Sequence, residues 1–224
     1  MTLINYIKEN QLKQYYIYNV PFVFKNKFTH DIDLNNVATY IERHLPSCFL
    51  NGIDEIMIGS FDFMKKRSVN ALFKDGIIYV QNDCQNEKDL LDDLIHEIGH
   101  RCEEMFSQEI YSDGKLEDEF LNKRIMLYRI LKEKNNGSFQ LIPLNGFANL
   151  EYDPQFDLFL FKQVGYDFLN ILTANVVLSP YALTSISDYW ANGFEKLYIE
   201  KNPQEIEKMC PVLFEKLDSV LNIC

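Results

Sequence analysis

The chain has 224 residues, of which 47% are hydrophobic and 14% aromatic, a composition that suits a globular domain with a sizeable core and excludes a disordered chain. Its 33 acidic and 22 basic residues give a formal net charge of −11, which disfavours non-specific binding to nucleic acid or to anionic membranes. We find no apolar run long enough to span a membrane and no N-terminal signal pattern. We therefore expect a cytoplasmic protein with neither nucleic acid nor membrane among its partners.

The N-terminal half mixes helix and strand patterns. Apolar residues recur at helical spacing before Pro46, and two apolar arms flank Asp75-Gly76, a pair typical of a tight hairpin turn. The clearest helix of the chain has an acidic first turn, which suits the positive end of a helix dipole. In chain order we expect a helix over residues 35–44, a strand over 53–61, a hairpin over 71–80 and a helix over 87–106.

The C-terminal half carries mainly helical patterns. The Pro-, Gly- and Asn-containing stretch 138–154 is expected to be a loop. Pro203 stands at a common helix-start position, and Pro211 is expected to kink the last helix. The expected helices cover residues 116–133, 156–172, 187–199 and 205–221.

This order, with mixed strands first and then mostly helices, indicates the α+β class. We expect a single domain over residues 1–224. Its N-terminal lobe, about residues 1–110, would hold a small mixed sheet and the helix over 87–106. Its C-terminal lobe, about residues 111–224, would be helical.

One motif in the 87–106 helix carries chemistry. His96-Glu97-Ile98-Gly99-His100 has the form HExxH and contains two of the chain's 4 histidines. Residues i and i+4 stack on one helix face about 6 Å apart along the axis, so both imidazoles can bind one zinc ion. Glu97 is turned about 100° away, where it can take a proton from a metal-activated water. The pattern predicts hydrolysis of peptide bonds; incidental histidines on a polar face, or a metal site without turnover, are the alternatives.

Catalytic zinc usually has three protein ligands, so a third ligand must be found. Glu103 lies on the same helix face as His96, but about 10 Å along the axis. Glu103 could join both histidines only if the helix broke. The better candidates lie downstream, in residues 179–198 with the sequence SPYALTSISDYWANGFEKLY.

The histidine motif, followed by Tyr181 and by Asp188-Tyr-Trp-Ala-Asn-Gly-Phe194, resembles the catalytic domain of the anthrax lethal factor family. Pro-Pro endopeptidases share that gluzincin-like arrangement. The segments DGIIYV, DDLIHEIGH and SPYA are also similar to segments of predicted peptidases from tailed bacteriophages. The resemblance covers roughly residues 71–224.

This resemblance implies a zincin-like metallopeptidase fold in which His96, His100 and Asp188 are the metal ligands. Tyr181 would donate its hydroxyl to the oxyanion of the tetrahedral intermediate. The family's third ligand is normally Glu; Asp is one methylene shorter, so its helix must approach the metal more closely. An acid that merely favours a helix N-terminus is the alternative for Asp188, and Glu195 is the fallback ligand on that helix.

The resemblance also implies a substrate strand. In zincins the strand before the active helix forms the edge of the cleft and pairs with an extended substrate backbone. Here that strand would be Ile77, Ile78, Tyr79 and Val80. An ordinary core strand is the alternative.

The sequence thus predicts a zinc-dependent endopeptidase with one Zn²⁺ per chain and a protein or peptide substrate. A catalytically silent zincin-fold module for binding or for the virion remains open, as does a zinc amidase acting on cell-wall peptide. The presence of both Glu97 and Tyr181 favours an enzyme. If the protein is phage-encoded, the host cytoplasm or the virion is its expected location.

Overall fold

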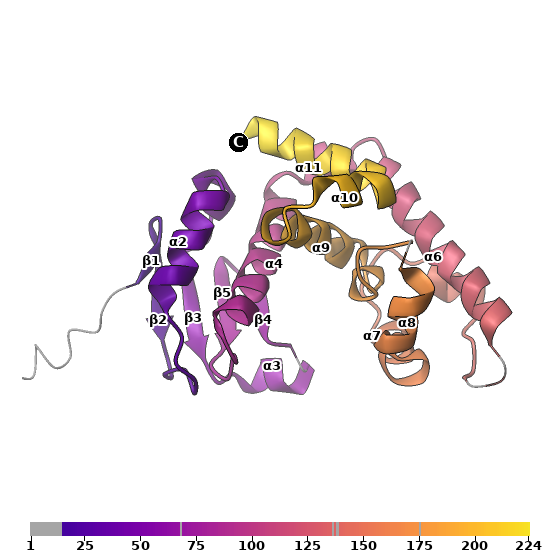
Figure 1. The fold of residues 1–224 in the computed structure, drawn as a ribbon, viewed down its shortest axis with the longest axis horizontal. Coiled ribbons are helices and arrows are strands. Elements are labelled where there is room, and N and C mark those ends of the chain that lie inside the picture. Colours follow the sequence, from indigo (N-terminus) through magenta and orange to yellow (C-terminus); the bar gives the residue numbers. More distant parts are fainter. Residues whose placement is uncertain (1–14, 68, 136, 138, 175) are drawn as a thin grey trace, which may run out of the picture. The chain divides into compact units, whose positions relative to one another are not determined.

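A computed structural model describes residues 15–67, 69–135, 137, 139–174 and 176–224. Strands occupy the N-terminal part and helices dominate the C-terminal part (Figure 1), which confirms the α+β class. The chain divides into two compact units, residues 1–97 and 98–224, and the boundary falls within helix α4 (Glu87–Met105). No helix in the described part of the chain is both long and apolar enough to cross a membrane.

The first unit contains a five-stranded mixed sheet with the order β1-β2-β3-β5-β4. The strands β2, β3 and β5 run parallel, while β1 and β4 are antiparallel to their neighbours at the two ends. The elements before α4 are β1 (Tyr16–Ile17), β2 (Val20–Phe24), α2 (Leu34–His44), the 3₁₀ helix η1 (Ser47–Leu50), β3 (Glu55–Gly59), α3 (Asp62–Arg67), β4 (Ala71–Lys74) and β5 (Ile77–Gln81). The sequence patterns did not predict β1, β2 or α3.

Alternation along the central strands separates two faces of the sheet. On one face Ile56 and Ile58 of β3 and Ile78 and Val80 of β5 are at most 1% exposed. These residues pair across the two strands, Ile56 with Ile78 and Ile58 with Val80. Burial of this aliphatic face provides the core of the first unit.

The predicted hairpin is confirmed in β4 and β5. Asp75 and Gly76 connect the strands with φ angles of 52° and 80°, as a type I′ turn requires. The expectation that Ile77–Val80 form an exposed edge is wrong, however. Strand β5 lies between β3 and β4 and pairs with both, so its backbone is not open to a further strand. The edge strand beside it is β4.

The second unit consists of helices in its described residues. After α4 come α5 (Ser107–Tyr111), α6 (Lys115–Lys134), η2 (Leu144–Phe147), α7 (Pro154–Leu158), the π-helical η3 (Phe159–Val164), α8 (Tyr166–Thr173), η4 (Tyr181–Leu183), α9 (Ile186–Ile199), α10 (Pro203–Met209) and α11 (Pro211–Ile223). The sequence patterns did not predict the short α5.

Two of the expected helices are divided in the structure. The helix expected over 156–172 is interrupted at Gly165, whose φ of 88° is readily adopted only by glycine. The helix expected over 205–221 ends at Met209, and Pro211 begins α11. The expected kink at Pro211 is therefore a helix start, because proline lacks the N–H that the first helical position leaves unpaired.

Helix α9 packs directly against the C-terminal part of α4. The Trp190 side chain is fully buried and donates from Nε1 to the carbonyl oxygen of Gly99, at 3.0 Å. A Cβ atom on Gly99 would stand 3.2 Å from the Cα atom of Ala191. The glycine within the HExxH motif thus permits a close helix crossing, and this crossing brings Asp188 near His100.

A buried arginine holds the segment that precedes α7. Arg124 of α6 is fully buried and donates to the backbone carbonyls of Gly146 and Asn149. Its guanidinium also lies 3.8 Å from the ring centroid of Phe156. The next carbonyl in the segment, that of Leu150, accepts from the N–H of Ile186 at 2.8 Å. Arg124 thereby supports the segment that meets the start of α9.

The Gly99→Ala substitution tests the close crossing. Alanine favours a helix by about 1 kcal/mol over glycine, but its Cβ would press on the Ala191 backbone, which cannot rotate away. Overpacking of this kind costs about 1–3 kcal/mol. We expect urea unfolding to show a net loss of about 1 kcal/mol. A gain that matches the helix propensity of alanine would contradict the close approach.

Candidate metal centre

Helix α4 runs without interruption through the motif and places His96 and His100 one turn apart. Nitrogen atoms of these two side chains and a carboxylate oxygen of Asp188 all lie within 4.8 Å of one another. It is the one group of this type found in the described part of the chain. The structure thus brings the three expected ligands together in a group that could bind a metal ion.

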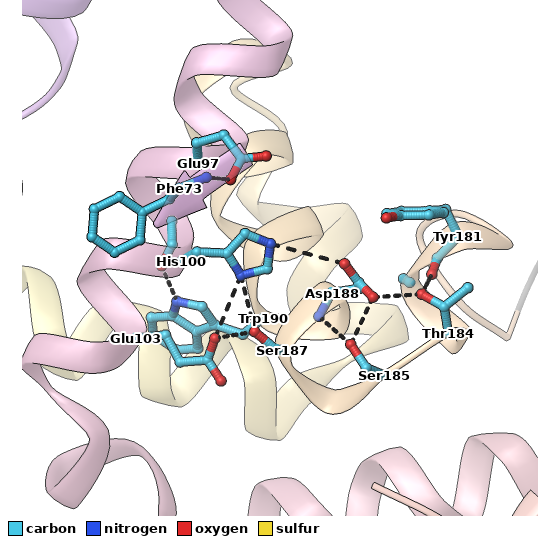
Figure 2. Close-up of polar contacts among 12 residues, drawn as sticks. Phe73, Glu97, His100, Glu103, Tyr181, Thr184, Ser185, Ser187, Asp188 and Trp190 are labelled. Carbon is cyan, nitrogen blue, oxygen red and sulfur yellow. Dashed lines mark hydrogen bonds and ion pairs between the residues drawn. The ribbon is translucent and has the colours of Figure 1, made fainter. Parts of the chain in front are cut away.

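Asp188 sits in the first turn of α9 and is 7% exposed. Its Oδ2 atom accepts hydrogen bonds from the hydroxyls of Thr184 and Ser185, both at 2.6 Å. Its Oδ1 atom lies 3.8 Å from His100 Nε2 (Figure 2). The two hydroxyls therefore hold one carboxylate oxygen and turn the other toward the histidine.

The other ring nitrogen of His100 is held from the opposite side. Its Nδ1 atom lies 2.9 Å from the hydroxyl oxygen of Ser187, and that hydroxyl donates to Oε2 of Glu103 (Figure 2). The hydroxyl of Tyr111 also donates to the Glu103 carboxylate. Burial, reinforced by the charge of Glu103, raises the pKa of Tyr111, so this tyrosine stays protonated and continues to donate.

Glu97 is 7% exposed and does not belong to the ligand group. Its Oε2 atom accepts from the backbone N–H of Phe73 at 2.6 Å (Figure 2). Phe73 belongs to the edge strand β4, so this carboxylate lies beside a strand edge. One turn earlier on α4, burial raises the pKa of Asp93 to about 7, with a further upward contribution from Glu97.

Tyr181 lies in η4, seven residues before Asp188, and is 36% exposed. Figure 2 shows its phenol ring beside Asp188, with the hydroxyl end directed toward the side of the site that holds His100. The hydroxyl of Thr184 lies 2.7 Å from the carbonyl oxygen of Tyr181. Thr184 therefore connects the segment that carries Tyr181 to the carboxylate of Asp188.

Glu103 and Glu195, the other two candidates for the third ligand, are not part of the group formed by His96, His100 and Asp188. The Glu103 carboxylate accepts hydrogen bonds from Ser187 and Tyr111, and its Oε2 lies 3.6 Å from Nδ1 of His100, not from the Nε2 that faces Asp188. Glu195 lies two turns beyond Asp188 on α9 and is not among the grouped ligands.

Sequence reasoning missed the three hydroxyls that orient the ligands, those of Thr184, Ser185 and Ser187. One signal was present for Ser185, because a serine three residues before an acid is typical of a helix N-cap. In the structure Ser185 does cap α9, and its Oγ accepts from the N–H of Asp188 at 3.0 Å. No pattern singled out Ser187 or Thr184.

No protein-family model, curated protein or solved structure matches this chain. The donor set of the site itself indicates its chemistry. Two imidazole nitrogens and one carboxylate oxygen suit zinc, and three protein ligands would leave a fourth position open, as in catalytic zinc sites. Nε2 of His100 and Oδ1 of Asp188 face each other at 3.8 Å and fit such an ion.

Asp188→Asn should greatly weaken zinc binding. The substitution keeps the size of the side chain but removes the charge of a ligand, so we expect a loss larger than the 10–100-fold that removal of an outer-shell partner typically costs, roughly more than 100-fold. Competition with a chromogenic chelator measures the affinity. Glu195→Gln is the control, since it removes the same charge from the same helix. Equal zinc affinity in both variants would show that Asp188 is not a ligand.

Proposed function

We propose that this protein is a zinc-dependent endopeptidase. The observation that carries the proposal is the convergence of His96 and His100 of α4 with Asp188 of α9; α4 also bears Glu97. A bound zinc ion would polarise the substrate carbonyl and lower the pKa of a water molecule. Three protein ligands with a neighbouring carboxylate are what hydrolysis by activated water requires.

Glu97 is the proposed general base. Its carboxylate accepts from Phe73 through Oε2, an interaction that fixes the side chain while leaving Oε1 to take up a proton from water. Burial of Glu97 limits competing hydrogen bonds from solvent. A carboxylate fixed in this way can accept the proton and later pass it to the leaving amine.

Tyr181 is the proposed donor to the oxyanion. Its position beside Asp188, its exposure and the direction of its hydroxyl (Figure 2) support this role. A donor aimed at developing negative charge is typically worth about 3 kcal/mol in the transition state. The role also agrees with the resemblance to the lethal factor family, in which a tyrosine lies seven residues before the acidic ligand.

The substrate strand is reassigned from β5 to β4. Strand β4 is at the end of the sheet order, and an extended peptide can add to such an edge through main-chain hydrogen bonds. Glu97 reaches the N–H of Phe73 on this strand. A peptide paired with β4 would therefore run beside the proposed general base, which supports a peptide as the substrate and a zincin-like fold for the chain.

Glu97→Gln should abolish hydrolysis while zinc remains bound. The amide can still accept from Phe73, but it cannot take up the proton of water, and loss of a general base typically costs about 10²–10⁴-fold in rate. The measurement is cleavage of a proteome-derived peptide library read by mass spectrometry, with zinc content determined on the same samples.

Glu104→Gln is the matched control for this test, because Glu104 lies on the same helix and its side chain is 63% exposed. Hydrolysis by Glu97→Gln at the wild-type rate would remove Glu97 from the mechanism. A wild-type chain that binds zinc yet cleaves no peptide would favour the silent module. Release of peptidoglycan fragments alone would favour the amidase.

Tyr181→Phe should lower kcat by about 10²–10³-fold, the usual effect of losing one oxyanion donor. Zinc affinity and KM should change little, because the hydroxyl is needed chiefly in the transition state. Kinetics on a peptide found in the library measure both constants. Tyr152→Phe, at another exposed tyrosine of the same unit, is the control. An increase in KM alone would instead make Tyr181 a substrate-binding residue.

A further inference from the structure

We propose that Ser187 and Glu103 are positioning residues that fix the Nδ1–H tautomer of His100 and thereby keep its Nε2 lone pair directed at the metal site. The role of this pair toward a metal rests on the proposed function. The tautomer itself can be measured without any metal. Neither residue would touch the ion or the substrate.

The direction of the protons follows from the hydrogen bonds. A carboxylate only accepts, so the Ser187 hydroxyl donates its single proton to Glu103. The Ser187 oxygen can then act only as an acceptor toward His100 Nδ1, 2.9 Å away. His100 must therefore carry a proton on Nδ1, which in the neutral ring leaves Nε2 with its lone pair.

Tyr111 completes the orientation of the carboxylate. Its hydroxyl donates to Oε1 of Glu103 while Ser187 donates to Oε2, so a separate donor occupies each oxygen. The side chain of Glu103 is 14% exposed and that of His100 is 22% exposed. Water therefore has limited access to these side chains and cannot readily replace the hydrogen bonds that set the direction of the protons.

The geometry on the Nε2 side agrees with this tautomer. Asp188 Oδ1 lies 3.8 Å from Nε2, a separation too long for a hydrogen bond. An ion bonded to both atoms at about 2.0–2.2 Å in tetrahedral geometry would hold them about 3.4 Å apart. The facing atoms are thus spaced for a shared cation and not for an N–H donor.

The pair also links the two ligand-bearing helices. Glu103 follows His100 by three residues on α4, and Ser187 directly precedes Asp188 on α9. One hydroxyl next to the third ligand therefore orients the second ligand. Outer-shell partners of this kind set the tautomer and ring orientation of a ligating histidine, and their loss typically costs 10–100-fold in metal affinity.

The test begins with the metal-free full chain and nitrogen-15-labelled histidine. Two-bond proton–nitrogen NMR spectra at about pH 8, above the usual histidine pKa of about 6.5, distinguish the two tautomers. We expect Nδ1–H for His100 in the wild type. Ser187→Ala and Glu103→Ala should populate Nε2–H, because the first removes the acceptor and the second frees the Ser187 proton to turn toward Nδ1. Ser187→Thr should restore the wild-type spectrum.

Zinc affinity is then measured on the same proteins by chelator competition. Ser187→Ala and Glu103→Ala should bind zinc about 10–100-fold more weakly, whereas Ser187→Thr should stay close to wild type. Glu104→Ala is the control, since it removes the neighbouring, exposed carboxylate and should alter neither the tautomer nor the affinity.

The possible failures can be told apart. An Nε2–H tautomer in the wild type, or a tautomer and affinity unchanged by Ser187→Ala and Glu103→Ala, would overturn this inference and leave the metal site in place. A wild-type chain that takes up no zinc would overturn the proposed function, whatever the tautomer of His100.

Discussion

The candidate metal centre depends on how closely α9 can approach α4. The contact is made where the motif has glycine: the carbonyl oxygen of Gly99 accepts from Trp190, and a Cβ atom at this position would stand 3.2 Å from the Cα atom of Ala191. An aspartate reaches about one methylene less far than a glutamate. A helix crossing without an intervening side chain compensates for that shorter reach. The use of Asp188 as a ligand therefore depends on glycine at position 99.

The N-terminus of α9 serves several purposes with short polar side chains. Ser185 caps the helix and bonds the Asp188 carboxylate, Thr184 bonds the same carboxylate oxygen, and Ser187 reaches His100. Such side chains lose little conformational entropy on burial. They also occupy little space, which lets three hydroxyls surround two ligands. Helix capping and ligand orientation are therefore coupled, and a change in the cap is expected to disturb the carboxylate as well.

Sequence patterns located the motif helix and the hairpin, because each depends on local periodicity or on turn chemistry, whereas Asp188 was indicated only by the resemblance to the lethal factor family. They failed where a structural feature depends on which elements lie next to each other in the fold. The alternation of Ile77–Val80 indicates a strand but not whether that strand lies at an edge, and pairing with β3 and β4 decided against an edge. Likewise, the sequence shows that Pro211 disrupts a helix, but not whether it kinks one helix or begins another. The non-helical backbone of Cys210 shows that a new helix begins.

The partners of the site were harder still to predict. Glu103 shares a helix face with His96, which makes it a candidate ligand by sequence, but its carboxylate accepts from the hydroxyls of Ser187 and Tyr111 instead. Ser187 lies 84 residues away from Glu103 in the chain. Serine is also common at helix starts for reasons unrelated to metals. A single sequence holds no local signal for a hydrogen bond between such distant residues.

Arg124 has a consequence for how the segment before α7 can vary. Its guanidinium donates to the carbonyl oxygens of Gly146 and Asn149, groups that every amino acid possesses, and the side chain is fully buried. Burial lowers its pKa to about 10, so it stays charged at neutral pH. Because Arg124 holds this segment through main-chain oxygens alone, the exposed side chains of the segment are free to diversify. Related chains could therefore carry different sequences here and keep the same path into α9.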